Sequence, residues 1–252
     1  MSQSTHLVLI PSYNTGPRLV ATVHEALERW EHVWVVVDGS TDGSDHALDY
    51  FSKASPNFRV LRLPRNSGKG AAVLAGAEEA KSAGYSHALV MDADGQHPAS
   101  QIVEFMESSR ANPKALILGK PVFGSDAPTI RLQGRKISVA LVHFEIFGAG
   151  INDPLFGFRV YPLAPLIKIM SRNSFARRYD FDPEMAVRLV WSGRPTVNIP
   201  ANCRYISLHD GGVSHFHYIR DNLRMVWLHT RLITELLLWR WPSVYRNRHA
   251  SK

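Results

Sequence analysis

The chain has 252 residues, of which 45% are hydrophobic, and a formal net charge of +7 with a pI of about 9.7. This composition excludes a disordered chain and allows one large α/β domain. Its single cysteine, Cys203, excludes an intramolecular disulfide and a cysteine-based metal cluster, as expected for a reducing compartment. The first residues lack a signal peptide's apolar run and no stretch approaches a membrane span in length, so we expect a cytoplasmic location.

Strands and helices are predicted to alternate over the first ninety residues. The apolar strands show no alternation with polar residues, which indicates a mostly parallel sheet covered by helices on both faces. The expected strands are His6–Ile10, Val33–Val37, Phe58–Leu63 and Ala88–Met91, and the expected helices are Arg18–Trp30, Ala47–Lys53 and Ala71–Ala83.

Three polar loops follow strands of this sheet: "PSYN", "DGSTDGS" and "DADGQH". In parallel sheets, ligands bind beyond the carboxyl ends of the strands, where these loops emerge together. In extended backbone, Asp92 and Asp94 point to the same side and could share one cation, and Mg²⁺ is usually held by one or two carboxylates plus substrate phosphates. The alternative is an ordinary Asp-rich turn. The convergence of three loops favours the metal site.

Two nucleotide-binding patterns are absent from the chain. No G-x-G-x-x-G follows the first strand, which argues against a nicotinamide dehydrogenase. The segment "NSGKGAA" does not fit the phosphate-binding P-loop, because Leu63 and Gly70 occupy positions where that motif needs Gly and Ser or Thr. What remains is a glycine-rich loop in which Lys69 can approach a diphosphate or a ribose. The alternative is a plain helix start.

The second half of the chain is less regular after Gly119. We expect helices at Arg131–Phe147 and Phe181–Ser192, with a loop and short strand in "GINDPLFGFRVYP" between them. Residues 1–217 are interpreted as one domain and residues 218–252 as a C-terminal extension.

Basic and tryptophan residues alternate in this extension, within an amphipathic helix predicted over Leu223–Trp241. The mixture favours contact with an anionic membrane surface, with packing on the domain or on another subunit as the alternative. No RNA-binding signature or zinc-finger spacing accompanies the charges, so nucleic acid is not expected as a partner. The residues are Arg220, Arg224, Arg231, Arg240, Arg246, Arg248 and Lys252, with Trp227, Trp239 and Trp241 between them.

Four motifs in order, "LVLIPSYN", "VVVDGSTDGS", "NSGKGAAVLAG" and "VMDADGQHP", resemble family 2 glycosyltransferases of the GT-A fold. Within that family, the continuation "DPLFGFRVY" and the compact length resemble the dolichyl-phosphate mannose synthases and related bacterial lipid glycosyltransferases. The resemblance covers about residues 6–220. It implies an α/β GT-A fold and an inverting, metal-dependent transfer of sugar from a nucleotide diphosphate.

The resemblance also implies residue roles on the donor side. Asp92 and Asp94 match the DxD motif that holds Mg²⁺ or Mn²⁺ and the donor diphosphate, and Gln96 matches a glutamine that completes the coordination. The implied nucleotide pocket consists of Pro11, Tyr13, Asn14, Asp38, Lys69 and Asp92. One departure is Val37, where the family usually has the first of two consecutive aspartates, so the base of the donor stays open.

On the acceptor side, alignment through Arg188 places Asp182 at the position of the family's catalytic base, which a hydroxyl acceptor needs. The alternative is that Asp182 caps the following helix. A lipid-phosphate acceptor is already ionised and needs cations instead, for which the resemblance points to Lys120 and Arg135. The segment "HDGGVSHFHYIRDN" resembles a closing loop in which Ser214, His215 and His217 replace a Ser-Lys pair.

The sequence therefore predicts a glycosyltransferase that uses a nucleotide-sugar donor and a lipid or polyprenyl-phosphate acceptor at the inner face of the cytoplasmic membrane. A sugar-nucleotide pyrophosphorylase would share the parallel sheet, but its glycine- and arginine-rich loop is replaced by "PSYNTGPRL". A catalytically silent binding or scaffold protein is the other alternative. The intact Asp92, Asp94, Gln96 and Asp182 argue against it.

Overall fold

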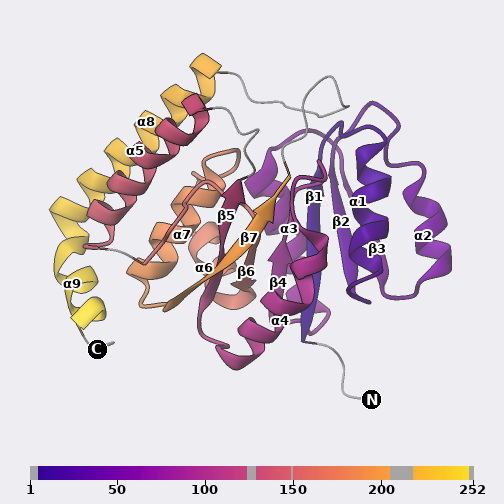
Figure 1. Ribbon diagram of the computed structural model, residues 1–252, viewed down its shortest axis with the longest axis horizontal. Helices are drawn as coiled ribbons and strands as arrows, with labels where there is room; N and C mark the ends of the chain where they lie inside the picture. Colours follow the sequence, from indigo (N-terminus) through magenta and orange to yellow (C-terminus); the bar gives the residue numbers. More distant parts are fainter. Residues whose placement is uncertain (1–4, 124–128, 149, 205–217, 250–252) are drawn as a thin grey trace.

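A seven-stranded sheet runs through the computed structural model, which describes residues 5–123, 129–148, 150–204 and 218–249 (Figure 1). Four of its six strand pairings are parallel: β3 (Phe58–Leu63) with β2 (Val33–Asp38), β2 with β1 (His6–Ser12), β1 with β4 (His87–Val90), and β5 (Leu116–Phe123) with β7 (Thr196–Cys203). The remaining strand, β6 (Arg159–Pro162), runs antiparallel to both β4 and β5. The mostly parallel sheet expected from the sequence is confirmed. From one edge of the sheet to the other, the strand order is β3, β2, β1, β4, β6, β5 and β7.

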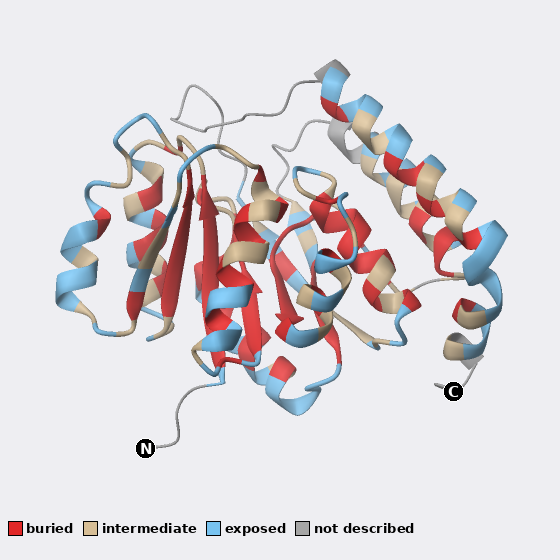
Figure 2. Ribbon diagram, turned by 180° about the vertical axis from the view of Figure 1, so that it is seen from behind, coloured by how far each residue is buried: buried red, intermediate tan, exposed pale blue. Residues whose placement is uncertain are grey.

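Helices cover both faces of the sheet, as the continuous apolar strands predicted. Leu7 and Leu9 of β1 pack into one buried cluster with α3 (Lys69–Ser82), α6 (Leu163–Ser171) and α7 (Phe181–Trp191). Val8 and Ile10 pack into a second cluster with α1 (Arg18–Leu27) and α4 (Ile102–Ala111). Figure 2 shows the resulting buried strands between the helical layers. The other helices of this part of the chain are α2 (Leu48–Ala54), the 3₁₀ turn η1 (Ala99–Gln101) that precedes α4, and α5 (Thr129–Glu145).

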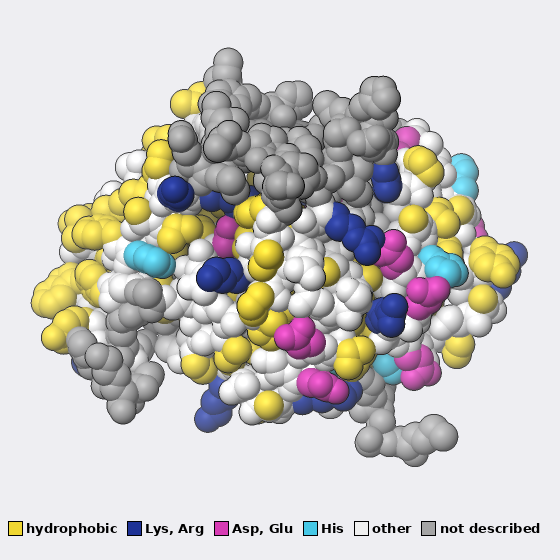
Figure 3. Space-filling model, in the orientation of Figure 1, with side chains coloured by type: hydrophobic (Ala, Val, Ile, Leu, Met, Phe, Trp, Pro, Cys, Tyr) yellow, Lys and Arg dark blue, Asp and Glu magenta, His cyan; other side chains and the backbone are white. Residues whose placement is uncertain are grey.

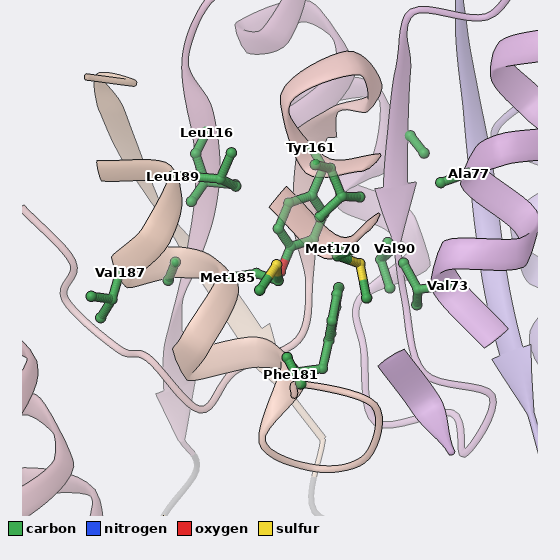
Figure 4. Packing of buried hydrophobic residues seen from close by; sticks show 14 of the residues in the cluster. Val73, Ala77, Val90, Leu116, Tyr161, Met170, Phe181, Met185, Val187 and Leu189 are labelled. Carbon is green, nitrogen blue, oxygen red and sulfur yellow. The ribbon is translucent and has the colours of Figure 1, made fainter. Parts of the chain in front are cut away.

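Helix α7 is anchored at its first residue. Phe181 is fully buried and points into the cluster beside Tyr161 and Met185, with its ring centroid 5.7 Å from that of Tyr161 (Figure 4). Burying a side chain of this size contributes about 1.5–3 kcal/mol relative to leaving it exposed. The backbone that carries the next residue, Asp182, is therefore fixed by the hydrophobic core.

The C-terminal segment consists of α8 (Tyr218–Glu235), the π-helical segment η2 (Leu236–Arg240) and α9 (Trp241–His249). One face packs on the domain, since α8 contacts α5, α9 contacts α7, and Leu228, Leu232 and Leu236 are buried in the first cluster. No helix among the described residues is both long and apolar enough to span a bilayer. Residue 218 as a domain boundary stays a prediction.

Some elements of the structure were not predicted from the sequence, among them α4, α6 and β7. Pro165 stands in the first turn of α6, and Pro200 stands within β7, where each interrupts the hydrophobic pattern. Proline is tolerated in both places. The N–H groups of the first helical turn have no partner within the helix, and β7 is an edge strand, where one side of the strand needs no hydrogen-bond donors. Helix α1 also ends at Leu27 rather than at Trp30.

Candidate active site

The loops after β1 and β2 are held together by side chains at the carboxyl end of the sheet. Asn14 Oδ1 accepts a hydrogen bond of 2.7 Å from the Thr41 amide, and the Asn14 amide donates to Ser40 Oγ at 3.0 Å. The sequence-predicted Pro11 is buried within β1, and Tyr13 is half-buried in the loop. The expected convergence of the first two polar loops is therefore present in the structure.

Asp38, at the end of β2, holds the glycine-rich loop in place at this edge of the sheet. It is 3% exposed, and its two carboxylate oxygens accept hydrogen bonds from the Ser67 and Gly68 amides at 2.8 and 2.7 Å. These bonds fix the glycine-rich loop that leads into α3. Contact of Asp38 with a base or ribose stays a prediction.

The glycines of that loop allow a close backbone approach. Gly68 has a φ of +101°, and a Cβ atom at Gly68 or Gly70 would collide with the carbonyl oxygens of Arg177 and Ala176, respectively. The Ala71 amide also donates to Arg177 O at 3.1 Å. The start of α3, with Lys69, is thereby pressed against the segment that precedes α7.

Lys69 connects two carboxylates from distant parts of the chain. Its Nζ lies 2.6 Å from Asp92 Oδ1 and 2.7 Å from Asp182 Oδ2, and the Lys69 and Asp182 side chains are 13% and 8% exposed. Burial by itself would lower the pKa of Lys69, but the carboxylates of Asp182 and Asp92 outweigh it and hold this pKa above its usual value. Lys69 is therefore a permanent cation between two acids.

Asp92 is oriented by His97, a buried residue of the same loop. The Asp92 amide donates to His97 Nδ1 at 2.8 Å, so the other ring nitrogen, Nε2, carries the proton and lies 3.6 Å from Asp92 Oδ2. Burial would raise the pKa of Asp92, yet the charge of Lys69 holds it below its usual value. The first carboxylate of the DxD motif is thus ionised and fixed in place.

The second carboxylate, Asp94, has a different environment. Its Oδ1 accepts a hydrogen bond of 3.0 Å from the Gln96 amide, and burial together with the charge of Asp92 raises its pKa. A cation placed between Asp92 and Asp94 would relieve this repulsion. The two half-buried carboxylates therefore present oxygen ligands in a negatively charged setting.

This donor set fits a hard divalent cation that a substrate completes. Within the described residues, no group of three or more His, Cys, Asp or Glu side chains could hold a metal ion by itself. Mg²⁺ and similar ions commonly take only one or two protein carboxylates and obtain their other ligands from phosphate oxygens and water. Asp92 and Asp94 match that pattern, with the Gln96 side chain close by in the chain.

Asp182 lies in the first turn of α7 and does not cap the helix. Residue Asp180 precedes the helix and accepts hydrogen bonds from the Ala176 and Arg178 amides, whereas one oxygen of Asp182 is bound to Lys69. The other oxygen, Oδ1, is buried and has no hydrogen-bond partner in the described structure. The capping alternative does not account for Asp182, and its orphaned oxygen is available to a ligand.

Arg159 and Gly157 complete the surroundings of this cluster and were not found from the sequence. Arg159 is fully buried, donates to Asp182 O at 2.5 Å and also donates to Phe156 O and Pro154 O. A Cβ atom at Gly157 would lie 2.5 Å from Lys69 Nζ. The segment "DPLFGFR" therefore lies directly against the site, and a side chain at position 157 would displace the Lys69 ammonium group from its place.

Two of the residues expected to bind an acceptor phosphate are described in the structure, and three lie outside the described residues. Lys120 is exposed on β5. Arg135 of α5 forms a two-pronged ion pair with Asp153, at 2.7 and 3.0 Å. Ser214, His215 and His217 lie outside the described residues. Phosphate binding by these five residues stays a prediction.

The fold and this site define a glycosyltransferase of the GT-A type. A mannosyltransferase from Pyrobaculum calidifontis, PcManGT, in complex with GDP-Man and Mn²⁺, superimposes with a TM-score of 0.61 over 98% of this chain and 74% of its own, at 16% identity. S. aureus TarS 1-349 in complex with UDP-GlcNAc gives a TM-score of 0.57 over 90% of this chain and 66% of its own, at 14% identity.

Residues 7–177 match the sequence profile of Glycosyl transferase family 2, and the chain belongs to that family. It is 32% identical over 201 residues to the polyprenol monophosphomannose synthase of Mycolicibacterium smegmatis, covering 77% of this chain and 75% of that protein. It is 29% identical over 199 residues to the dolichyl-phosphate beta-glucosyltransferase ALG5D of Trichomonas vaginalis, covering 71% of this chain and 59% of that protein. The family predicted from the four motifs is confirmed.

Proposed function

We propose that this enzyme transfers a sugar from a nucleotide diphosphate to the phosphate of a polyprenyl-type lipid, with the help of Mg²⁺ or Mn²⁺. The observation that carries the proposal is the cluster of Lys69, Asp92, Asp94 and Asp182 at the carboxyl end of the sheet. The names of the two relatives, a polyprenol monophosphomannose synthase and a dolichyl-phosphate beta-glucosyltransferase, support a lipid-phosphate acceptor.

The donor is proposed to lie over the loops that follow β1, β2 and β4. Asp92 and Asp94 would hold the cation, which supplies positive charge to the diphosphate as it leaves. Pro11, Tyr13, Asn14 and Asp38 form the nucleotide pocket implied by the family motifs. The fixed loops mean that little rearrangement of the backbone is needed to receive a donor.

Transfer is proposed to be a single displacement with inversion. An acceptor oxygen bonds to the anomeric carbon while the bond from that carbon to the diphosphate oxygen breaks, and the nucleoside diphosphate leaves. An ionised lipid phosphate has no proton to lose in this step, whereas an alcohol does. The orphaned Oδ1 of Asp182 is suited to accept such a proton or to bind a sugar hydroxyl.

The general test is a panel of nucleotide sugars, incubated with Mn²⁺ or Mg²⁺ and a polyprenyl monophosphate. Release of the nucleoside diphosphate should require both the metal and the lipid, and the product should carry the sugar on the lipid phosphate. Release that is equally fast without the lipid, with every donor, would contradict the proposed transfer.

The role of Asp182 depends on the acceptor, and Asp182→Asn tests it. With an alcohol as acceptor, we expect turnover to fall by about 10²–10⁴-fold, the usual contribution of a general base. With a lipid phosphate, we expect a much smaller loss, because no proton has to be removed. The measurement is kcat with each acceptor, together with the donor Kd. Asp180→Asn, two residues away, is the control for local packing.

Wild-type turnover of Asp182→Asn on an alcohol acceptor would rule out the base role. An equally large loss with both acceptors would instead show that Asp182 acts through its ion pair with Lys69.

The C-terminal helices are proposed to bind the enzyme to the anionic inner face of the cytoplasmic membrane. Hydrophobic side chains gather on the outer side of α5, α8, η2 and α9, visible at one edge of the molecule in Figure 3. Their exposed fractions reach 70% at Trp239 and 65% at Ile137. An apolar surface of this extent, mixed with arginines, is typical of a surface that enters the headgroup region of a bilayer.

The expected membrane contact can be tested without truncating α8, which carries buried residues of the core. Leu238→Gln with Trp241→Gln removes two exposed apolar side chains of this surface. We expect binding to anionic vesicles to weaken about tenfold or more, since burying each side chain is worth about 1.5–3 kcal/mol. Flotation at low and high salt provides the measurement, and high salt should weaken binding further.

The matched control is Tyr50→Gln with Val103→Gln, which removes an exposed aromatic and an exposed aliphatic side chain elsewhere. Equal loss in both double variants, or no flotation of the wild-type protein at low salt, would contradict membrane contact through this surface.

A further inference from the structure

A groove lies on the side of α7 that faces away from the active site. Residues 182 and 184 are two positions apart on a helix and so point to opposite sides. Asp182 contacts Lys69, whereas Glu184 is fully buried and accepts hydrogen bonds from Arg188 at 2.8 Å and from Arg231 of α8 at 2.9 Å. The groove between α6, α7 and the C-terminal helices is thus separate from the donor site.

The walls of this groove carry a strong excess of positive charge. It encloses about 1090 Å³, and six basic side chains and one acidic side chain line it. Three of the basic residues are engaged in ion pairs, because Arg188, Arg231 and Arg240 share the two carboxylates of Glu184 and Glu235. The other three form no ion pair with any described residue: Lys168, Arg172 and Arg194.

The ion pairs at the base of the groove also make it a fixed structure. Arg188 lies between Glu184 and Glu235, so it ties α7 to α8, and Arg231 lies 3.9 Å from the Phe175 ring centroid. The Nε atom of Arg231 is buried without a hydrogen-bond partner in the described structure, as is that of Arg194. Donors therefore remain unsatisfied in a groove that has three uncompensated cations.

Two tryptophans connect the groove with the apolar surface described above. Trp227 and Trp239 line the groove and are 59% and 70% exposed. Indole rings are suited to the headgroup level of a bilayer, where one end is apolar and the other is wet. The groove thus combines cations that favour a phosphate with an apolar rim that favours acyl chains.

We propose that this groove binds the phosphate headgroup of an anionic phospholipid, with Lys168, Arg172 and Arg194 around the phosphate and Trp227 and Trp239 beside the chains. The proposal rests on the proposed membrane contact and adds a defined lipid site to it. The occupant is a bilayer phospholipid rather than the acceptor, because an acceptor phosphate has to reach the donor on the opposite side of α7.

The test compares two triple variants with the same loss of net charge. Lys168→Gln, Arg172→Gln and Arg194→Gln remove the three uncompensated cations of the groove. The control variant, Arg29→Gln, Lys53→Gln and Lys81→Gln, removes three exposed cations elsewhere. Binding is measured with phosphatidylcholine vesicles that contain or lack phosphatidylglycerol.

We expect the groove variant to lose about a hundredfold in affinity for the phosphatidylglycerol vesicles, since each basic residue near an anionic surface is worth about 1 kcal/mol. The control variant should lose no more than a few-fold. Equal losses would show diffuse attraction by net charge and overturn the proposed site.

Two further measurements separate this proposal from those on which it rests. Dihexanoyl-phosphatidylglycerol below its micelle concentration should bind the wild-type protein and not the groove variant, even if vesicles fail to bind. Dihexanoyl-phosphatidylcholine should bind neither, and absence of dihexanoyl-phosphatidylglycerol binding to the wild type would overturn the site. With a short, water-soluble prenyl phosphate as acceptor, the groove variant should keep its turnover. Loss of that turnover would show that the groove holds the acceptor and would overturn the assignment to a phospholipid.

Discussion

Replacing Asp94 by alanine is expected to abolish sugar transfer and the metal-dependent part of donor binding. Asp94 is proposed to hold the cation that faces the donor diphosphate, and such a cation contributes several kcal/mol of charge stabilisation in the transition state. A loss of at least about 10³-fold in kcat/KM follows from that magnitude. Stability should change by less than about 1 kcal/mol, because the charge of Asp94 is repelled by Asp92 in the folded protein.

The measurement is a titration of the nucleotide sugar with and without Mn²⁺, followed by turnover at saturating donor. Asp49→Ala, an exposed carboxylate on α2, is the control. If the Asp94→Ala protein kept its metal-dependent donor affinity, the assignment of the cation to the DxD motif would be wrong.

Replacing Lys69 by methionine is expected to damage both stability and activity. The substitution leaves Asp92 and Asp182 on either side of a missing cation, and removing one partner of a buried ion pair costs about 3–5 kcal/mol. For a chain of this size, the melting temperature should fall by roughly 6–20 °C. Thermal unfolding followed by circular dichroism measures the loss.

Lys81→Met, at the exposed end of the same helix, controls for the change in helix composition. It should unfold within a few degrees of the wild type. A Lys69→Met protein that unfolds at the temperature of the wild type and still transfers sugar would show that the two carboxylates do not depend on this lysine.

The sheet could be predicted because the apolar composition of its strands directly indicates that they are buried. Strands β1, β2 and β4 are apolar except at their ends, and all of their residues are buried in the structure. The antiparallel position of β6 could not be predicted, since "RVYP" has the same apolar character in either direction. The direction of strand pairing depends on the path by which the chain returns to the sheet, and the local pattern of hydrophobic residues does not indicate that path.

The site could be predicted only in part for a similar reason. The spacing of Asp92 and Asp94 is local and visible in the sequence, whereas the ion pair between Lys69 and Asp182 joins residues 113 positions apart. Arg159 and His97 are recognisable only by their burial and their backbone partners. Such contacts depend on the finished tertiary structure, and one sequence carries no signal for them.

The buried charges of α7 also limit how this chain can change over generations. Glu184 is bonded to Asn173, Arg188 and Arg231, which come from three different segments. Losing Glu184 alone leaves the buried Arg231 without its carboxylate partner, at a cost of about 3–5 kcal/mol out of the 5–15 kcal/mol by which domains are usually stable. A lineage can therefore replace this network only through several simultaneous substitutions, and its descendants are expected to inherit Glu184 and both arginines together or none of the three.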